Sequence, residues 1–199
     1  MITTNIMQAQ ETISLMKPNL DGGASIMQSL AKRSSIRDFD TTPLTIGDLS
    51  NLLWAANGIN REDGKRTAPS AYNAQDIEIF VFLKEGVYYY DAADHKLVRK
   101  AKGDHRKLIA AAQEFVLESP TALLLVSDLA KLERSGDRKE LIASIDAGIV
   151  SQNIALFCAG NNLANIPRIG MKTEEIKELL DLGDSMLPVM NNVVGYFPK

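Results

Sequence analysis

Helical and extended patterns are mixed along this chain without a regular strand–helix–strand alternation, which limits the fold classes that it can adopt. The runs IEIFVFL (77–83) and TALLLVS (121–127) have the β-branched, aromatic and apolar content of strands. A return strand is expected at 87–91, after the Glu85-Gly86 turn, and a last strand at 191–197. Because strands and helices do not alternate strictly, the pattern favours an α+β fold.

The helical segments have recognisable starts and ends. Residues 25–33 predict a short helix, followed by an extended segment at 34–40. Thr45 with Asp48 three residues later forms a capping-box pattern for a helix that stops at Gly58. Further helices are expected at 106–118, at 173–182, and from 129 to about 162, where Ile145 and later apolar residues predict a largely buried helix.

Length and charge indicate one globular domain. A chain of 199 residues with 45% apolar content can bury a single core. We expect residues 1–24 to be a loosely structured N-terminal arm and residues 25–199 to be one domain. The net charge of −3 provides no field to attract nucleic acid or anionic lipid.

Several classes of protein and site are disfavoured. The longest apolar runs have about five residues, against the ~20 needed to span a bilayer, and the N-terminal residues do not resemble a signal peptide. The single cysteine, Cys158, fits a reducing cytoplasm and excludes an internal disulfide. His95 and His105 lack metal-ligand spacing, and neither a GxGxxG nor a P-loop pattern is present.

The first candidate for chemistry is KRSSIRDF (32–39). Residues two apart in an extended segment project to the same side, about 6 to 7 Å from one to the next. Arg33, Ser35 and Arg37 would therefore present two cationic forks and a hydroxyl on one face, which suits a phosphate and a polar ring edge. The alternative is an ordinary solvated surface near a helix end.

Two later segments carry weaker signals. In PSAYNAQDI (69–77), Asn73, Gln75 and Ile77 share a strand parity, and their amides suit a pyrimidine-like edge, unless the segment is only a turn that satisfies its own backbone. In NIPRIGM (165–171), Gly170 would let a flat ligand approach the backbone, or it is only a turn before a helix capped by Thr173.

The order and spacing of these segments resemble the FMN-dependent nitroreductase family across roughly residues 25–198. The matching patterns are R-x-S-x-[RK]-x-F (Arg33, Ser35, Arg37, Phe39), P-S-x-x-N-x-Q (Pro69, Ser70, Asn73, Gln75), D-x-G-x-x-x-Q-N (Asp146, Gly148, Gln152, Asn153), P-x-x-G (Pro167, Gly170) and G-Y-x-P (Gly195, Tyr196, Pro198). The sequence at 52–71 and 85–97 is similar to that of the SagB/ThcOx-type branch of the family, which includes azoline oxidases.

The resemblance implies a central, mainly antiparallel sheet flanked by helices, in a homodimer with FMN at the subunit interface. It implies contacts to FMN from Arg33, Ser34, Ser35 and Arg37, from the other subunit's turn, and from the backbone of Ile169 and Gly170. The turn residues would be Pro69, Ser70, Ala71, Asn73 and Gln75. The flavin carries the chemistry in such proteins, so no side-chain nucleophile and no metal are expected.

The implied activity is NAD(P)H-driven reduction of a nitroaromatic, quinone-like or other small acceptor. Two alternatives stay open, namely an azoline or other substrate dehydrogenase and a flavin-binding protein without turnover. Many members of the family continue past G-Y-x-P with basic residues that contact the phosphate, whereas this sequence stops at Lys199. Phosphate binding should then depend heavily on Arg33 and Arg37.

Overall fold

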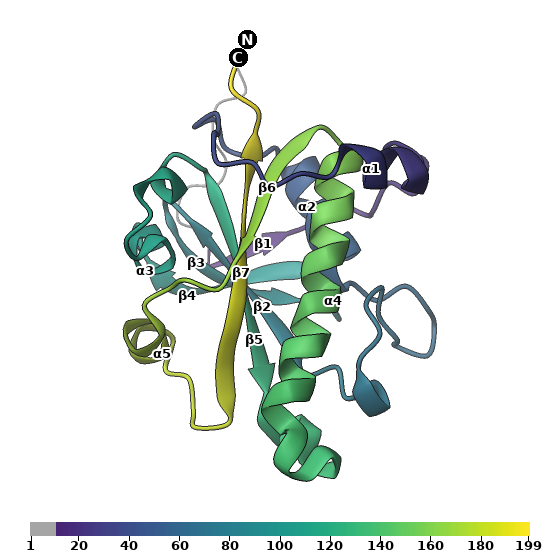
Figure 1. The fold of residues 1–199 in the computed structure, drawn as a ribbon, viewed down its shortest axis with the longest axis vertical. Coiled ribbons are helices and arrows are strands. Elements are labelled where there is room, and N and C mark those ends of the chain that lie inside the picture. The colour runs from purple at the N-terminus through teal and green to yellow at the C-terminus, as the bar shows by residue number, and fades with distance from the viewer. Residues whose placement is uncertain (1–10) are drawn as a thin grey trace.

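The structure, a computed structural model, describes residues 11–199 and is built on a seven-stranded antiparallel sheet (Figure 1). The strands are β1 (Thr12–Ser14), β2 (Ile77–Leu83), β3 (Gly86–Asp91), β4 (Lys96–Lys102), β5 (Thr121–Asp128), β6 (Leu163–Arg168) and β7 (Met186–Tyr196). Their order is β1-β4-β3-β2-β5-β7-β6, and all six neighbouring pairs are antiparallel. The expected α+β fold with an antiparallel sheet is confirmed.

Helices cover both faces of this sheet. The α-helices are α1 (Ile26–Lys32), α2 (Ile46–Asn57), α3 (Arg106–Ala110), α4 (Lys139–Gly160) and α5 (Thr173–Leu180), and the 3-10 segments are η1 (Ala71–Asn73), η2 (Glu114–Leu117) and η3 (Leu129–Arg138). In Figure 1, α1, α2 and α4 lie to one side of β7, and α3 and α5 lie to the other. The central strands β2 and β5 are therefore covered on both faces, which explains their continuous apolar sequences.

The buried side chains form one cluster on each face. Ile79 and Val81 of β2 pack in the cluster that also contains α2 and α4 residues, whereas Phe80 and Phe82 pack with residues of α3 and α5. This division follows from the two-residue period of a strand, which points successive side chains to opposite faces.

The start of α2 confirms the predicted cap. The Thr45 side chain accepts a hydrogen bond from the Asp48 amide (3.1 Å), and the Tyr196 hydroxyl donates to the Asp48 carboxylate (2.6 Å). At the other end, a Cβ on Gly58 would lie 2.7 Å from the Trp54 Cα, so lack of space requires glycine there. The hydrogen bond from Tyr196 to Asp48 connects the C-terminal Gly195-Tyr196 motif to the start of α2.

The expected loose N-terminal arm is wrong for residues 12–14. These residues form β1, which pairs with β4, and Ile13 is buried. The Met16 amide also donates to the Ser50 hydroxyl in α2 (2.9 Å). Residues 15–24 of the expected arm form no helix or strand, and residues 1–10 lie outside the described residues.

The expected helix at 106–118 is confirmed only over 106–110 and is wrong beyond Ala110. α3 ends at Ala110, Ala111 has a φ of 50°, and the chain continues as a 3-10 turn at 114–117. The carbonyl oxygens of Ile109 and Ala110 accept hydrogen bonds from the buried Arg168 side chain. Arg168, distant in the sequence, therefore uses carbonyl groups that would accept hydrogen bonds from the next turn if α3 continued.

Three smaller differences from the sequence-based expectations concern β6, α5 and α4. Residues 164–168, for which no strand was expected, belong to β6, an edge strand where Pro167 is tolerated. Thr173 begins α5 but gives it no side-chain cap. Ile145, expected to be buried in α4, is 53% exposed.

One segment, 129–160, is by length and composition apolar enough to cross a membrane, although the sequence pattern gave no such expectation. Its small and polar residues interrupt the apolar runs, so only an average over a long window makes it apolar. In the structure α4 buries Ala147, Val150 and Ile154 in the core beside α2. This is the packing of a core helix of a globular protein.

Candidate functional site

The KRSSIRDF segment leaves the end of α1 and runs beside β6. Its Ile36 amide donates to the Asn165 carbonyl in β6 (2.9 Å), and Phe39 is buried in the core. The backbone at Arg33 is already extended, with φ −56° and ψ 120°, so α1 stops there. These contacts fix the segment over an edge of the sheet.

The side chains of this segment alternate as the sequence predicts. Lys32, Ser34 and Ile36 line a hollow of about 180 Å³ against α4 and β6. Arg33, Ser35 and Arg37 do not line this hollow and, like Lys32 and Ser34, are exposed. None of these three side chains has a hydrogen bond or an ion pair to any of residues 11–199. They form what we call the arginine face, and Ser34, also predicted as a site residue, points to the other side.

The turn at 69–75 differs from the extended segment that was predicted. Tyr72, Asn73 and Gln75 have φ values of 55°, 54° and 49°, so Asn73 and Gln75 do not share a strand parity with Ile77. The Ser70 hydroxyl accepts a hydrogen bond from the Gln75 amide (2.8 Å) and closes the turn. The alternative of a turn that satisfies part of its own backbone is therefore correct.

The two amide side chains of this turn are used differently. Gln75 accepts from Arg66 (3.0 Å) and donates to the Gly64 carbonyl (3.1 Å), so its amide braces the turn from within. Asn73 is exposed, and its oxygen accepts only a long hydrogen bond from Gln75 (3.4 Å). Asn73, unlike Gln75, can offer most of its hydrogen-bonding capacity to a ligand.

Two buried carboxyl groups, Asp76 and Asp146, lie next to the turn, and the sequence did not predict a structural role for either. Asp146 of α4 accepts a hydrogen bond from the Ala71 amide (3.0 Å), and Asp76 accepts one from the Ser127 hydroxyl (2.6 Å). Burial raises the pKa of Asp76 to about 6, and hydrogen bonding and charge repulsion from Asp146 act in the same direction. The local signals for this pair were the position of Asp76 directly before an apolar strand and the place of Asp146 at the start of the D-x-G-x-x-x-Q-N pattern.

The loop after β6 exposes its backbone. Ile169 is 79% exposed and Gly170 is also exposed, while the preceding Arg168 is 8% exposed. The Gly170 carbonyl accepts a hydrogen bond from the Asn191 side chain (3.1 Å). Gly170 is thus held in place and open to solvent, and its contact with a flat ligand stays a prediction.

Within one chain, the arginine face and the 69–75 turn lie near opposite ends of α4. The 69–75 turn contacts α4 at Asp146, which accepts a hydrogen bond from the Ala71 amide. The arginine face begins beside Gly160, because the Arg33 amide donates to the Ser29 carbonyl and the Ser29 hydroxyl lies 2.6 Å from where a Cβ of Gly160 would be. Asp146 and Gly160 are separated by about 21 Å along the helix axis at 1.5 Å per residue. The structure therefore does not bring these two predicted parts of the site together within one chain.

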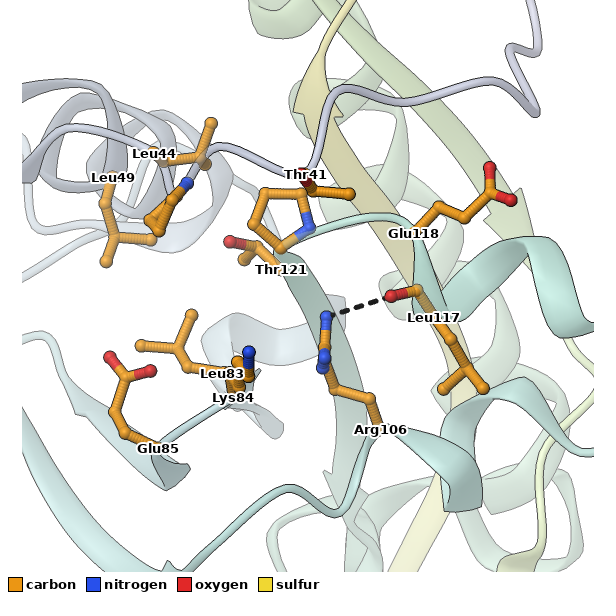
Figure 2. A pocket seen from close by; sticks show the side chains of 12 residues that line it. Thr41, Leu44, Leu49, Leu83, Lys84, Glu85, Arg106, Leu117, Glu118 and Thr121 are labelled. Carbon is orange, nitrogen blue, oxygen red and sulfur yellow. Dashed lines mark hydrogen bonds between the residues drawn. The ribbon is translucent and has the colours of Figure 1, made fainter.

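A separate hollow of about 160 Å³ lies at the start of β5 (Figure 2). Figure 2 shows Arg106 and Glu85 at this hollow, together with apolar side chains that include Leu44 and Leu83. None of the predicted site residues lines it. It is therefore a different feature from the arginine face.

Other reactive groups are engaged in the fold. Cys158 is fully buried, and burial raises the pKa of its thiol. His95 contacts the Tyr90 hydroxyl (2.9 Å) and the Met16 carbonyl (2.8 Å), and burial lowers its pKa. Among residues 11–199, no group of three or more His, Cys, Asp or Glu side chains could hold a metal ion.

The chain is similar to known proteins over nearly its whole length. The model of the Nitroreductase family matches residues 30–196. The Methanocaldococcus jannaschii protein MJ1384 is 30% identical over 190 residues, which cover 90% of this chain and 96% of that protein. A crystal structure from Ralstonia eutropha JMP134 has a TM-score of 0.89 and 32% identity over 96% of this chain and 91% of that one. Both proteins carry the description "putative nitroreductase".

A third similarity concerns the fold alone. A crystal structure from Anabaena variabilis ATCC 29413 has a TM-score of 0.79 and 21% identity, covering 99% of this chain and 45% of that one. The match of the family model to residues 30–196 includes the arginine face, the turn and the loop after β6. The chain therefore belongs to the nitroreductase family of oxidoreductases.

Proposed function

We propose that this protein is an FMN-dependent oxidoreductase that uses NAD(P)H to reduce a nitroaromatic, quinone-like or other small acceptor. The observation that carries this proposal is the arginine face, where Arg33, Ser35 and Arg37 are exposed and have no partner within residues 11–199. Guanidinium groups bind phosphate oxygens in pairs of parallel hydrogen bonds, and a serine hydroxyl can bind the ribityl chain.

The remaining predicted residues suit the flavin ring. The Ile36 amide donates a hydrogen bond to the Asn165 carbonyl. Ile169 lies four residues of extended chain beyond Asn165, a distance of about 13 Å. A mononucleotide with its phosphate at the arginine face could span this distance and reach the exposed backbone of Ile169 and Gly170. The Asn73 amide, with a donor and an acceptor, would bind the ring edge.

We infer that two copies of the chain build each site. The 69–75 turn lies too far from the arginine face to serve the same flavin, so the turn would come from the other subunit. Two sets of exposed apolar residues support such a dimer: an apolar strip on α4, Leu141 and Ile145, and a patch on α1 beside the far end of α4, Ile26, Met27 and Leu30, all 48–71% exposed. Exposed apolar residues gathered on neighbouring helices are typical of a protein–protein interface.

In this assignment the protein binds and orients the reactants. Bound FMN would accept two electrons and a proton from NAD(P)H and deliver them to the acceptor. The chain's own contribution would be to hold the phosphate at Arg33 and Arg37 and the ring at Gly170. We place the activity in the cytoplasm, because the sequence has a single cysteine.

The first test is the absorbance of the purified protein incubated with FMN. We expect a yellow protein that bleaches when NADH or NADPH is added without oxygen. Bound flavin that neither nucleotide reduces would favour a substrate dehydrogenase, such as an azoline oxidase, or a flavin-binding protein without turnover. A colourless protein that does not bind added FMN would overturn the proposal.

The second test removes the arginine face. The variant Arg33→Ala with Arg37→Ala should stay folded and dimeric but lose FMN, because both charges that would hold the phosphate are gone. Lys84→Ala with Lys102→Ala is the matched control, since it removes two exposed positive charges elsewhere and should retain FMN. Full flavin occupancy in the arginine variant, measured by absorbance after gel filtration, would contradict the assignment of this face.

A further inference from the structure

Two arginine side chains, Arg106 and Arg168, are buried to the same extent, with 8% exposure each. Both donate hydrogen bonds to backbone carbonyl groups. Burial of a charge is costly unless a partner of opposite charge or several hydrogen bonds compensate it. The two arginines differ in how this cost is met.

Arg106 is neutralised by a carboxylate. Its Nε and Nη2 atoms donate to the two oxygens of Asp104 at 2.9 and 2.6 Å. Its remaining nitrogen donates to the carbonyls of Ser119 (2.6 Å) and Leu117 (3.3 Å), the latter drawn as a dashed line in Figure 2. The adjacent carboxylate of Asp104 therefore neutralises the charge of Arg106.

Arg168 has only neutral acceptors. It donates to the side-chain oxygens of Gln113 (2.7 Å) and Asn191 (3.0 Å) and to the carbonyl oxygens of Ile109 (3.0 Å) and Ala110 (3.2 Å). In the part of the chain that the structure describes, no acidic side chain pairs with it. Burial lowers its pKa, but a guanidinium group stays protonated at neutral pH. A positive charge without a counter-ion is thus held inside the protein.

This charge lies beside the loop that would meet the flavin. A Cβ on Gly170 would be 3.5 Å from Nη2 of Arg168. Asn191 connects the two residues, because its oxygen accepts from Arg168 and its nitrogen donates to the Gly170 carbonyl (3.1 Å). Arg168 therefore both fixes the Gly170 backbone and places its charge next to it.

We propose that Arg168 is a positioning residue that also makes the site bind reduced flavin more tightly than oxidised flavin, an inference that rests on the proposed function. In the proposed reaction a hydride, two electrons and one proton, moves from NAD(P)H to the oxidised flavin, leaving NAD(P)⁺ and a ring with one additional negative charge. An uncompensated cation in a medium of low dielectric constant favours that extra charge. The same charge paired with a carboxylate, as at Arg106, would not.

The test gives Arg168 a counter-ion without removing it. Gln113→Glu keeps the size of the side chain and places a carboxylate where the 2.7 Å hydrogen bond now lies. We expect the affinity for reduced FMN relative to oxidised FMN to fall about tenfold, which lowers the midpoint potential of bound FMN by about 30 mV for two electrons. Thermal unfolding should show that the variant is as stable as the wild type, or more so.

Ala112→Glu is the matched control. Residue 112 is exposed and precedes Gln113, so this variant adds the same charge to the same turn without replacing an acceptor of Arg168. Its potential should shift by less than a third of the Gln113→Glu shift. Equal shifts in the two variants, or no shift in Gln113→Glu, would overturn the role of Arg168 while the wild type still binds FMN. A wild type that binds no FMN would overturn the proposed function and this role together.

Discussion

At the scale of single residues, Asp76 links the fold to pH. Its side chain is fully buried, and burial raises its pKa from 3.8 to about 6, helped by the neighbouring Asp146. At pH values between 3.8 and about 6, Asp76 therefore keeps a proton in the folded protein that it has lost in the unfolded chain. The stabilising contribution is complete below about pH 4 and disappears as the pH rises through 6.

We expect the free energy of unfolding of the wild type to fall by on the order of 3 kcal/mol from this group between pH 4 and pH 7. Asp76→Asn should remove this decrease, because an amide can donate to Asp146 at every pH. Urea unfolding of both proteins at four pH values measures the difference between them.

Asp104→Asn is the control for this prediction. Although burial raises the pKa of Asp104, the hydrogen bonds and charge of Arg106 lower it below the usual value overall. Stability from Asp104 is therefore lost only as the pH falls below about 4, so this variant should keep the wild-type slope between pH 4 and pH 7. If Asp76→Asn also kept that slope, the carboxyl pair would not hold a proton.

At the scale of elements, α4 contains a glycine that its own chain does not require. Gly148 is exposed in the middle of the helix, and a Cβ there would have no neighbour within 4 Å. A glycine inside a helix costs about 1 kcal/mol relative to alanine. Close approach of a second copy at this position would explain its presence, since Leu141 and Ile145 lie on the same strip of α4.

Gly148→Ala should therefore weaken the dimer at least tenfold, because the added methyl group separates the two copies, while helix propensity improves. Sedimentation velocity over a range of concentrations measures this effect. Gly160→Ala serves as the contrast: its Cβ would lie 2.6 Å from the Ser29 hydroxyl, so the variant should lose stability at every concentration. A gain of about 1 kcal/mol in Gly148→Ala without any change in dimerisation would place Gly148 outside the interface.

At the scale of the whole molecule, a change that separates the dimer should also abolish FMN binding. If each flavin is bound by the arginine face of one copy and the 69–75 turn of the other, a monomer has only part of each site. The proposal therefore connects the apolar strip of α4 to flavin binding, although no residue of that strip would touch the cofactor.

Ile145→Glu places a charge in the middle of this strip, where the wild-type side chain is 53% exposed. We expect a folded monomer with little bound FMN, detected by light scattering after gel filtration together with the absorbance spectrum. Ala93→Glu adds the same side chain at an exposed turn between β3 and β4 and should stay dimeric and yellow. A monomeric Ile145→Glu that keeps its flavin would show that one chain is sufficient.

Much of the fold follows from local patterns. The buried strands β2 and β5 read as continuous apolar runs, and the Thr45 cap and Gly58 bounded α2 correctly. The missed strands lie toward the ends of the sheet: β4 has a charged sequence, β6 contains a proline, and β1 has three residues. Their strand character depends on their neighbours more than on their own composition.

The sequence by itself determined the alternation of Arg33, Ser35 and Arg37, because the two-residue period of an extended chain is a local property. The tertiary structure alone decided the surroundings of Asp76 and Arg168. Asp76 meets Asp146 across 70 residues, and Arg168 finds its acceptors in segments 55 to 59 residues earlier and 23 residues later. Whether a buried charge has a counter-ion depends on which distant segments pack around it, and no local pattern encodes that.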